Sequence, residues 1–267
     1  FPVRITDPQA FLALTERYRE ANFGSCVIRE LEYTYHNWYD SRKETLTVFA
    51  YLLDTMRSPN ELYAALLNAY GMPQWWSDDP YIVMLESVLV QNTAWTNVRR
   101  TSEALGKLRN PKAITAMSDE ELTARLRPCG FARRKAQTIR ALTDWYAAYG
   151  YAGKSIQAID QNRLRHELLA LPGIGEETAD VILVYAFFKP SFILDAYTRR
   201  WLERLGFEAK NDDERRLFFE TGLKRDATLY GHFHWLILDH SIARCRKTPL
   251  CIDCPFPDEC NLVNHTS

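Results

Sequence analysis

The chain has 267 residues, 46% of them hydrophobic, which is enough to bury the core of one large domain or two modest ones. Its 33 basic and 34 acidic residues give a net charge of −1, so no overall positive field indicates a nucleic-acid partner. The apolar runs fall short of the ~20 residues of a membrane-spanning helix. The first residues lack the basic head and apolar stretch of a signal peptide, so we expect neither a membrane nor a secretory route.

Helical signals dominate the chain from residue 58 onward. Ser58-Pro59-Asn60-Glu61 places a capping serine before proline and a glutamate three residues later, and it predicts a helix that ends at Gly71. Ser118 repeats this capping pattern, and Asp160 predicts the start of another helix. A later apolar helix should end at Lys189-Pro190, since proline lacks the backbone donor. Strand alternation is scarce, so the sequence predicts an all-α fold.

Two segments carry no motif of their own. Residues 1–57 form an N-terminal extension of unknown role, with an aromatic-rich polar run at 33–39 that is most simply explained by packing. Residues 125–140 contain six basic side chains and no acid. Such a stretch predicts either a local DNA-binding surface or a solvated helix face.

A glycine-containing turn at residues 171–175 joins two predicted helices. Gly173 and Gly175 permit a sharp turn and a close approach, so backbone N–H groups around Ile174 and Gly175 could meet a phosphate at the start of the next helix. This arrangement would bind a nucleic-acid backbone without reading its sequence. The alternative is an ordinary helix–helix turn.

Four cysteines near the C-terminus predict a metal centre, with Cys26 and Cys129 as isolated thiols typical of a reducing cytoplasm. The ligands would be Cys245, Cys251, Cys254 and Cys260. Four thiolates hold either zinc or a [4Fe–4S] cluster. One close pair flanked by single cysteines favours the cluster over zinc, whose ligands usually come as two close pairs. Arg246 and Lys247 beside the first ligand could reach a phosphate or simply face solvent.

These features together resemble the helix-hairpin-helix DNA glycosylase superfamily, which includes endonuclease III. The resemblance rests on residues 171–180, 193–197 and 234–238 and on the cysteines, and it covers the chain from about residue 58 to its end. Residues 91–93, 127–131 and 177–186 are most similar to the 3-methyladenine DNA glycosylase III group. The first cysteine interval is one residue shorter than that of endonuclease III relatives.

The resemblance implies two helical lobes and a catalytic aspartate. A six-helix lobe would span about 80–190, and a second lobe would combine 58–79 with 191–267, including a cluster loop at 245–260. A damaged nucleotide would rotate out of the duplex into a cleft between the lobes. Asp195 matches the family's catalytic aspartate, which stabilises the cationic sugar and positions the attacking water. Alternatively, Asp195 only caps the following helix.

The resemblance also implies which chemistry is missing. Relatives that cut the DNA strand carry a lysine two residues after the second hairpin glycine, where this chain has Glu177. A lysine amine is needed for the Schiff base that precedes strand cleavage. A monofunctional glycosylase without AP lyase activity is therefore expected. The adenine-excising branch is disfavoured as well, because its catalytic glutamate aligns with Ser87.

Aromatic residues are the expected base-recognition elements. Trp75, Trp76 and Trp95 lie where related glycosylases place rings around an extruded base, and rings attract a cationic alkylated purine. Glu86 is a further candidate for the base pocket, although such a residue more often faces water. Gln91 and Asn92 resemble the wedge that fills the gap left by the flipped nucleotide; the alternative is a polar helix end.

The sequence therefore predicts an iron–sulfur DNA glycosylase of base excision repair, acting on an alkylated purine such as 3-methyladenine. The expected partner is double-stranded DNA with damaged bases, bound by a cytoplasmic or nucleoid-associated monomer without a nucleotide cofactor. Two alternatives stay open. The same fold could act on deaminated or mismatched bases, or the chain could bind lesions without catalysis.

Overall fold

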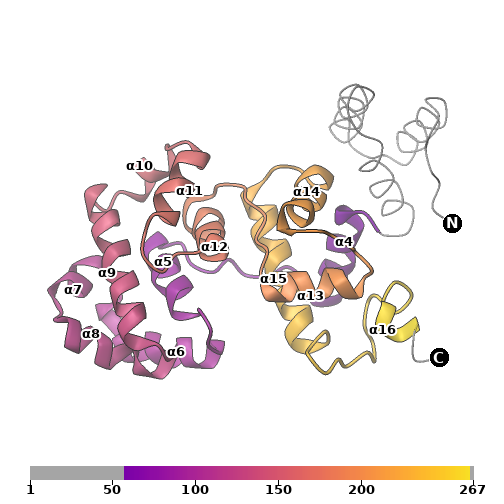
Figure 1. The fold of residues 1–267 in the computed structure, drawn as a ribbon, viewed down its shortest axis with the longest axis horizontal. Coiled ribbons are helices and arrows are strands. Elements are labelled where there is room, and N and C mark those ends of the chain that lie inside the picture. Colours follow the sequence, from indigo (N-terminus) through magenta and orange to yellow (C-terminus); the bar gives the residue numbers. More distant parts are fainter. Residues whose placement is uncertain (1–56, 265–267) are drawn as a thin grey trace. The chain divides into compact units, whose positions relative to one another are not determined.

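The computed structural model describes residues 57–264, and within this range the secondary structure consists of helices without any β-strand. The predicted all-α fold is confirmed for these residues. They form two compact units (Figure 1). The first unit contains residues 57–73, 194–225 and 233–264, and the second contains residues 74–193 and 226–232. Apart from Arg57, the N-terminal extension lies outside the described residues.

The second unit is built around two helices that are buried on nearly every side. α5 (Pro80–Leu89) and α12 (Glu176–Phe187) pack against each other, and α5 also packs against α9 (Ala132–Ala148). All residues of α12 from Thr178 to Phe187 are buried, so this helix has no polar stripe. The remaining helices are α6 (Trp95–Leu105), α7 (Pro111–Ala116), α8 (Asp119–Leu126), α10 (Gly153–Gln157) and α11 (Gln161–Leu169), with 3-10 turns at Gly106–Leu108 and Arg127–Cys129.

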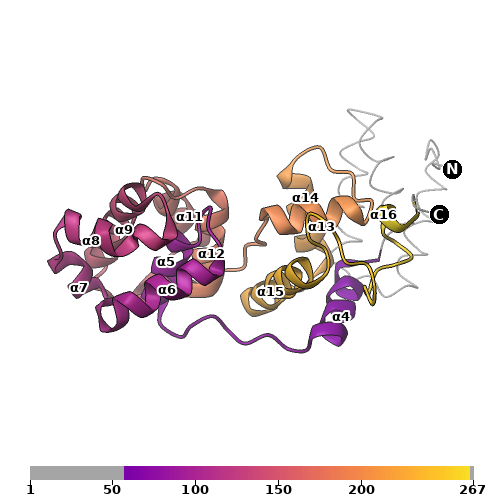
Figure 2. The same cartoon turned by 90° about the horizontal axis from the view of Figure 1, so that it is seen from below.

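The first unit packs its helices around aromatic rings. It contains α4 (Pro59–Tyr70), α13 (Ala196–Arg204), α14 (Asp212–Gly222), most of α15 (Ala227–Ala243) and the short α16 (Asn261–Asn264). α4 lies beside α15 (Figure 2), where the ring centroids of Tyr63 and Phe233 are 5.4 Å apart. Trp201 of α13 completes this core, with its ring edge-on to Phe256 at 5.4 Å. Such ring pairs stabilise a core beyond their buried area.

The predicted helix starts are confirmed. Ser58 and Glu61 form a reciprocal capping box, and the side chains of Ser118 and Asp160 accept hydrogen bonds from the first turns of α8 and α11. The end of α12 differs slightly from the prediction. The helix stops at Phe187 because Phe188 adopts a left-handed conformation, before proline can interrupt it.

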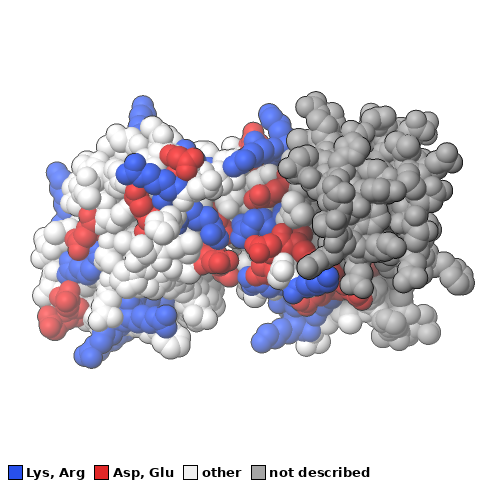
Figure 3. Space-filling view, turned by 45° about the horizontal axis from the view of Figure 1, so that its top comes forward, with Lys and Arg blue, Asp and Glu red and all other residues white. Residues whose placement is uncertain are grey.

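The surface carries mixed charge. Figure 3 shows basic and acidic side chains interspersed over the described part of one face, in line with the net charge of −1. Within the described range, no helix is both long enough and apolar enough to cross a bilayer.

Candidate active site and nucleic-acid interface

Asp195 occupies the N-cap position of α13. Its Oδ1 atom accepts a 2.7 Å hydrogen bond from the backbone N–H of Thr198, and the residue is only 6% exposed. The start of a helix stabilises a negative charge through its unpaired N–H groups and its dipole. Asp195 therefore caps the helix, and the same contact stabilises the anionic form of its carboxylate.

His234 of α15 approaches the other oxygen of this carboxylate. The distance from His234 Nε2 to Asp195 Oδ2 is 3.6 Å, and both side chains are buried. Burial by itself would raise the pKa of Asp195, because it disfavours the charged form. The hydrogen bond and charge of His234, together with the Thr198 N–H, outweigh burial and hold the pKa below its ordinary value. Asp195 is thus an ionised carboxylate in a largely dry environment.

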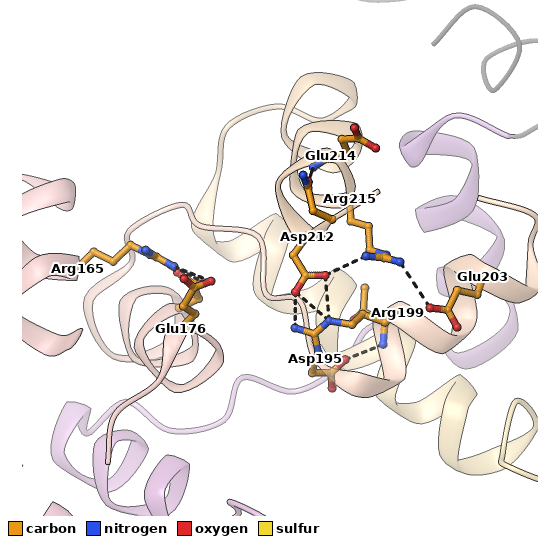
Figure 4. A network of polar contacts seen from close by, with 11 residues as sticks. Arg165, Glu176, Asp195, Arg199, Glu203, Asp212, Glu214 and Arg215 are labelled. Atoms are coloured by element: carbon orange, nitrogen blue, oxygen red, sulfur yellow. Dashed lines mark hydrogen bonds and ion pairs between the residues drawn. The ribbon is translucent and has the colours of Figure 1, made fainter. Parts of the chain in front are cut away.

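Ion pairs fix the first turn of α13 against α14 (Figure 4). The Nη2 atom of Arg199 lies 2.7 Å from Asp212 Oδ2, and Arg215 also binds Asp212 at 3.1 Å. Arg215 further reaches Glu203, at 3.5 Å. The hydrogen bond from Arg199 is the main cause that lowers the pKa of Asp212. Both partners of the Arg199–Asp212 pair are about one third exposed, so the pair orients the helix more than it stabilises the fold.

The cysteine segment is attached to the same helix. Arg200 Nε donates to the carbonyl of Cys245 at 3.0 Å, and Arg204 Nη1 lies 3.2 Å from the Cys245 sulfur. Arg204 also donates to the carbonyls of Arg246 and Lys247. The side chains of Arg246 and Lys247 are exposed, as a phosphate contact would require.

The four cysteines lie near one another in the first unit. Burial raises the pKa of the Cys254 thiol, and the nearby thiols of Cys260, Cys245 and Cys251 raise it further. Cys245 and Cys260 are buried, while Cys251 is exposed. Among residues 57–264, no group of three or more His, Cys, Asp or Glu side chains is arranged as a metal-ion site. Four thiols are the ligands that an iron–sulfur cluster takes, so the residue types fit such a cluster. The positions of these four side chains do not match those of ligands around a bound metal.

The hairpin turn requires glycine at one of its two glycine positions. Gly173 has φ +83°, and a Cβ atom there would lie 2.1 Å from Thr138 Oγ1 of α9. Gly175 caps α12 with φ −95° and would have nothing within 4 Å of an added Cβ. Ile174 between them is buried at 6% exposure and holds the turn in the core. The open space at Gly175 leaves room for a phosphate beside the N-terminus of α12.

The two predicted wedge residues have different environments. Gln91 is half-buried, and its Nε2 atom donates to the Gly173 carbonyl at 3.1 Å and to Thr178 Oγ1 at 2.9 Å. Asn92 is exposed and has a positive φ of 52°. Gln91 therefore connects the end of α5 to the hairpin through hydrogen bonds, whereas Asn92 is exposed to solvent. Insertion into DNA stays a prediction for both.

Glu86 does not face water. It is 8% exposed, and its Oε2 atom accepts a 2.8 Å hydrogen bond from the indole Nε1 of Trp76. Its Oε1 atom accepts from Ser102 Oγ at 2.7 Å and from Arg109 Nη1 at 3.0 Å. Burial of a carboxylate costs free energy unless it is paired in this way.

The predicted tryptophans gather in one cluster of rings in the second unit. Trp76 is edge-on to Trp95 at 5.3 Å and to Tyr185 at 5.5 Å between centroids. Trp75 is tilted against Tyr185 at 5.0 Å and stacks on Phe188 at 5.2 Å. Its ring fits because Gly231 has no side chain, since a Cβ there would lie 2.8 Å from the indole. Tyr185 thus contacts the rings of both Trp75 and Trp76, and Trp76 in turn contacts Trp95. The sequence did not single out Tyr185.

The basic stretch at 125–140 divides into structural and exposed residues. Lys135 is 3% exposed and its Nζ donates to the carbonyls of Leu89 and Cys129, both at 2.8 Å. Burial lowers its pKa. Arg133 and Arg134 are exposed.

Phe131 lies close to these arginines in the chain, and the sequence alone did not indicate it as a candidate DNA-contacting residue. Its side chain is 68% exposed and its φ is +49°, at the start of α9. An exposed phenyl ring suits stacking on a base, and the exposed Arg133 and Arg134 nearby in the sequence suit contact with a phosphate. The signal in the sequence is Gly130-Phe131, one residue ahead of the paired Arg133 and Arg134.

Comparison with known proteins places this geometry in a family. Residues 85–224 match the model of a protein family described as "HhH-GPD superfamily base excision DNA repair protein". The chain belongs to the HhH-GPD superfamily. The match includes Glu86, the hairpin and Asp195, and it ends before the four C-terminal cysteines. The resemblance predicted from the sequence is confirmed, and with it the assignment to the DNA glycosylases of base excision repair.

Individual HhH-GPD relatives differ in what they are named for. A putative DNA repair glycosylase of Methanocaldococcus jannaschii is 36% identical over 207 residues, covering 75% of this chain and 94% of the relative. Endonuclease III of Thermotoga maritima is 28% identical over 70% of this chain and 82% of its own length. The solved Helicobacter pylori 3-methyladenine DNA glycosylase (MagIII), bound to 1,N6-ethenoadenine, is 28% identical with a TM-score of 0.61, covering 70% of this chain and 98% of that one.

Proposed function

We propose that this HhH-GPD protein is a monofunctional DNA glycosylase that hydrolyses the N-glycosidic bond of an alkylated purine with Asp195 as its catalytic carboxylate. The observation that carries the proposal is the buried, ionised Asp195 at the start of α13, 3.6 Å from His234. As the base leaves, positive charge develops on the sugar. A fixed carboxylate in dry surroundings stabilises that charge and orients or deprotonates the attacking water.

The absence of strand cleavage is supported by the residues around the hairpin. Glu177 stands where a Schiff-base lysine would be needed, and Glu176 beside it is also acidic. Lys135 is no substitute, because its amine is buried and donates to two backbone carbonyls. Hydrolysis would therefore release the base and leave an abasic site with the strand intact.

The ring cluster supports an alkylated purine as the substrate. A base that carries a positive charge after alkylation is attracted to the electron-rich faces of Trp75, Trp76 and Trp95 more strongly than a normal base. The positive charge also makes the base a good leaving group, so no strong general acid is required. The likeness to MagIII points to the same class of lesion.

A second candidate substrate is a mismatched or deaminated base. It is favoured by a relative from Aeropyrum pernix named thymine-DNA glycosylase, which is 28% identical over 199 residues. Neutral leaving groups would need hydrogen bonds from the protein to the departing base. Glu86, the polar residue next to Trp76, already binds three donors.

The DNA would be held by separate elements of the chain. The backbone N–H groups of Gly173 and Gly175 suit one phosphate, and Arg246 and Lys247 suit another. The N–H of Ile174 already donates to the carbonyl of Leu171 at 3.2 Å, so it closes the turn itself. Asn92, which is exposed, would occupy the gap left by the extruded nucleotide. Gln91 would join it only by giving up its hydrogen bonds to Gly173 and Thr178.

A [4Fe–4S] cluster on the four cysteines would serve as a cross-link. Cys245, Cys251, Cys254 and Cys260 would hold it, and endonuclease III relatives support its presence. It would fasten the segment from 245 to 260 that Arg200 and Arg204 attach to α13. In this role the cluster supplies stability and positions Arg246 and Lys247.

The test is an assay of base release and strand breakage. The purified full chain is incubated with methylated duplex DNA and with duplexes that contain uracil, hypoxanthine or a thymine mismatch. Release of methylated purine, with strand breaks only after alkali, is the expected result. Release only from the uracil, hypoxanthine or mismatch duplexes would select the second candidate, and breaks without alkali would overturn the monofunctional mechanism.

A further inference from the structure

Glu86 makes a contact that the family's catalytic scheme does not use. Its carboxylate lies inside the second unit and binds the indole N–H of Trp76 through one oxygen and Ser102 and Arg109 through the other. Ser102 comes from α6, and Arg109 follows the 3-10 turn after it. The two donors on Oε1 fix the carboxylate, so that Oε2 has a defined direction toward Trp76.

The position of the Trp76 ring depends on this hydrogen bond. Trp76 is half-exposed and lies at a bend in the irregular segment before α5, outside any helix that would orient it. The contacts of its ring with Trp95 and Tyr185 are edge-on and lack the directionality of a short hydrogen bond. An indole held by a charged acceptor is more narrowly oriented than one held by packing alone.

We propose that Glu86 is a positioning residue that orients Trp76 for stacking on the extruded base. This inference rests on the proposed function, since it assumes that the ring cluster receives a base. Ser102 and Arg109 offset the cost of burying the carboxylate, and Trp76 uses the oxygen that remains. The effect of Glu86 on base release would therefore pass entirely through the Trp76 N–H.

The experiment is a double-mutant cycle with a matched control. Glu86→Gln weakens the acceptor, Trp76→Phe removes the N–H and keeps an aromatic ring, and the double variant combines them. Glu167→Gln is the control, because it weakens the acceptor of another indole in the same unit, that of Trp145 at 3.2 Å, which has no proposed role in base binding. Base release from methylated duplex is measured under single turnover at saturating protein. Binding to a duplex with an abasic-site analogue and the melting temperature are measured alongside.

The expected result is that Glu86→Gln and Trp76→Phe each slow base release about five- to thirty-fold, in the range of a partly lost stacking interaction. The double variant should be no slower than the slower single variant, because both remove the same contact. Glu167→Gln should release base within about twofold of the wild type, and duplex binding should be unchanged in all variants. A purely structural role of Glu86 would lower the melting temperature without this pattern.

Two outcomes would overturn the inference. One is a Glu86→Gln variant as fast as the wild type, and the other is a double variant whose defect multiplies the two single defects. If Glu86→Gln does not fold, release by Trp76→Phe at the wild-type rate also overturns it. If the wild type releases no base from any duplex, the proposed function fails separately. In that case the quenching of tryptophan fluorescence by free 3-methyladenine is compared between the wild type and Glu86→Gln. Equal quenching in the two proteins would show that Glu86 has no positioning role.

Discussion

The imidazole of His234 lies 3.6 Å from the carboxylate of Asp195, with both side chains buried in the first unit. The pair joins the N-terminus of α13 to α15. Because Thr198 binds the other carboxylate oxygen at 2.7 Å, Asp195 is held from two directions. Its negative charge is therefore fixed in place before any substrate arrives, as electrostatic stabilisation of a cationic sugar requires.

Removing the charge of Asp195 should abolish base release without unfolding the protein. Asparagine is as good a helix cap as aspartate, so Asp195→Asn keeps α13. We expect the single-turnover rate on methylated duplex to fall by on the order of 10²–10³, with unchanged affinity for the duplex. Asp212→Asn is the control, since it alters a carboxylate on α14 that binds Arg199 and lacks the proposed role. Equal losses in both variants would contradict a catalytic Asp195.

The pH dependence of base release should follow the pKa of Asp195. Since that pKa lies below the ordinary value of 3.8, the active carboxylate persists as the pH falls and is lost only on passing through the lowered pKa. His234→Gln removes the imidazole and leaves the carboxylate buried. The acid limb of the rate profile should then move to higher pH, because the group that lowers the pKa of Asp195 is gone and its burial remains. An unmoved limb, with the fold verified by circular dichroism at each pH, would separate His234 from Asp195.

A lysine at position 177 should create a covalent intermediate. Glu177→Lys places an amine two residues after Gly175, where strand-cutting relatives carry theirs. We expect borohydride to trap a protein–DNA adduct with this variant and none with the wild type. Glu176→Lys adds the same charge one residue away and serves as the control. Trapping with both variants, or with neither, would show that position 177 alone does not decide the chemistry.

The cysteine segment should bind iron and sulfide. Anaerobically purified protein is expected to be brown and to contain iron and acid-labile sulfide in equal amounts. Cys251→Ser should lose both, whereas Cys129→Ser should keep them, because Cys129 is buried beside Thr101 in the other unit. A colourless wild-type protein containing zinc would refute the cluster.

The two hairpin glycines should differ in what they tolerate. Gly173→Ala forces a Cβ onto Thr138 at a positive φ, and it should lower the free energy of unfolding by roughly 2 kcal/mol or more. Gly175→Ala meets no neighbour and should leave stability nearly unchanged. Chemical denaturation of both variants measures this difference. Comparable destabilisation would mean that Gly175 is structurally required as well.

Local signals in the sequence were sufficient for the helix starts and for the family. Ser58, Asp160 and Asp195 cap helices through neighbours within three residues, so short patterns contain the necessary information. Glu86 illustrates what such patterns lack. Its partners Ser102 and Arg109 lie 16 and 23 residues away on other elements, and only the packed unit brings them together.

Burial was equally hidden at two other positions. Lys135 belongs to a stretch that reads as basic surface, yet its amine binds the carbonyl of Leu89, 46 residues earlier in the chain. Gln91 was expected to contact DNA, and its amide is engaged by Gly173, 82 residues later. Long-range partners of this kind depend on how α5, α9 and the hairpin meet, which composition and periodicity do not specify.

α13 is a helix of nine residues whose two ends contact different parts of the first unit. Its first turn carries Asp195, and its later turns hold the cysteine segment through Arg200 and Arg204. Oxidative damage to the cysteines would loosen the far end of this helix, and a helix transmits such a displacement along its axis. The carboxylate of Asp195, at the near end, would then lose part of its fixed position.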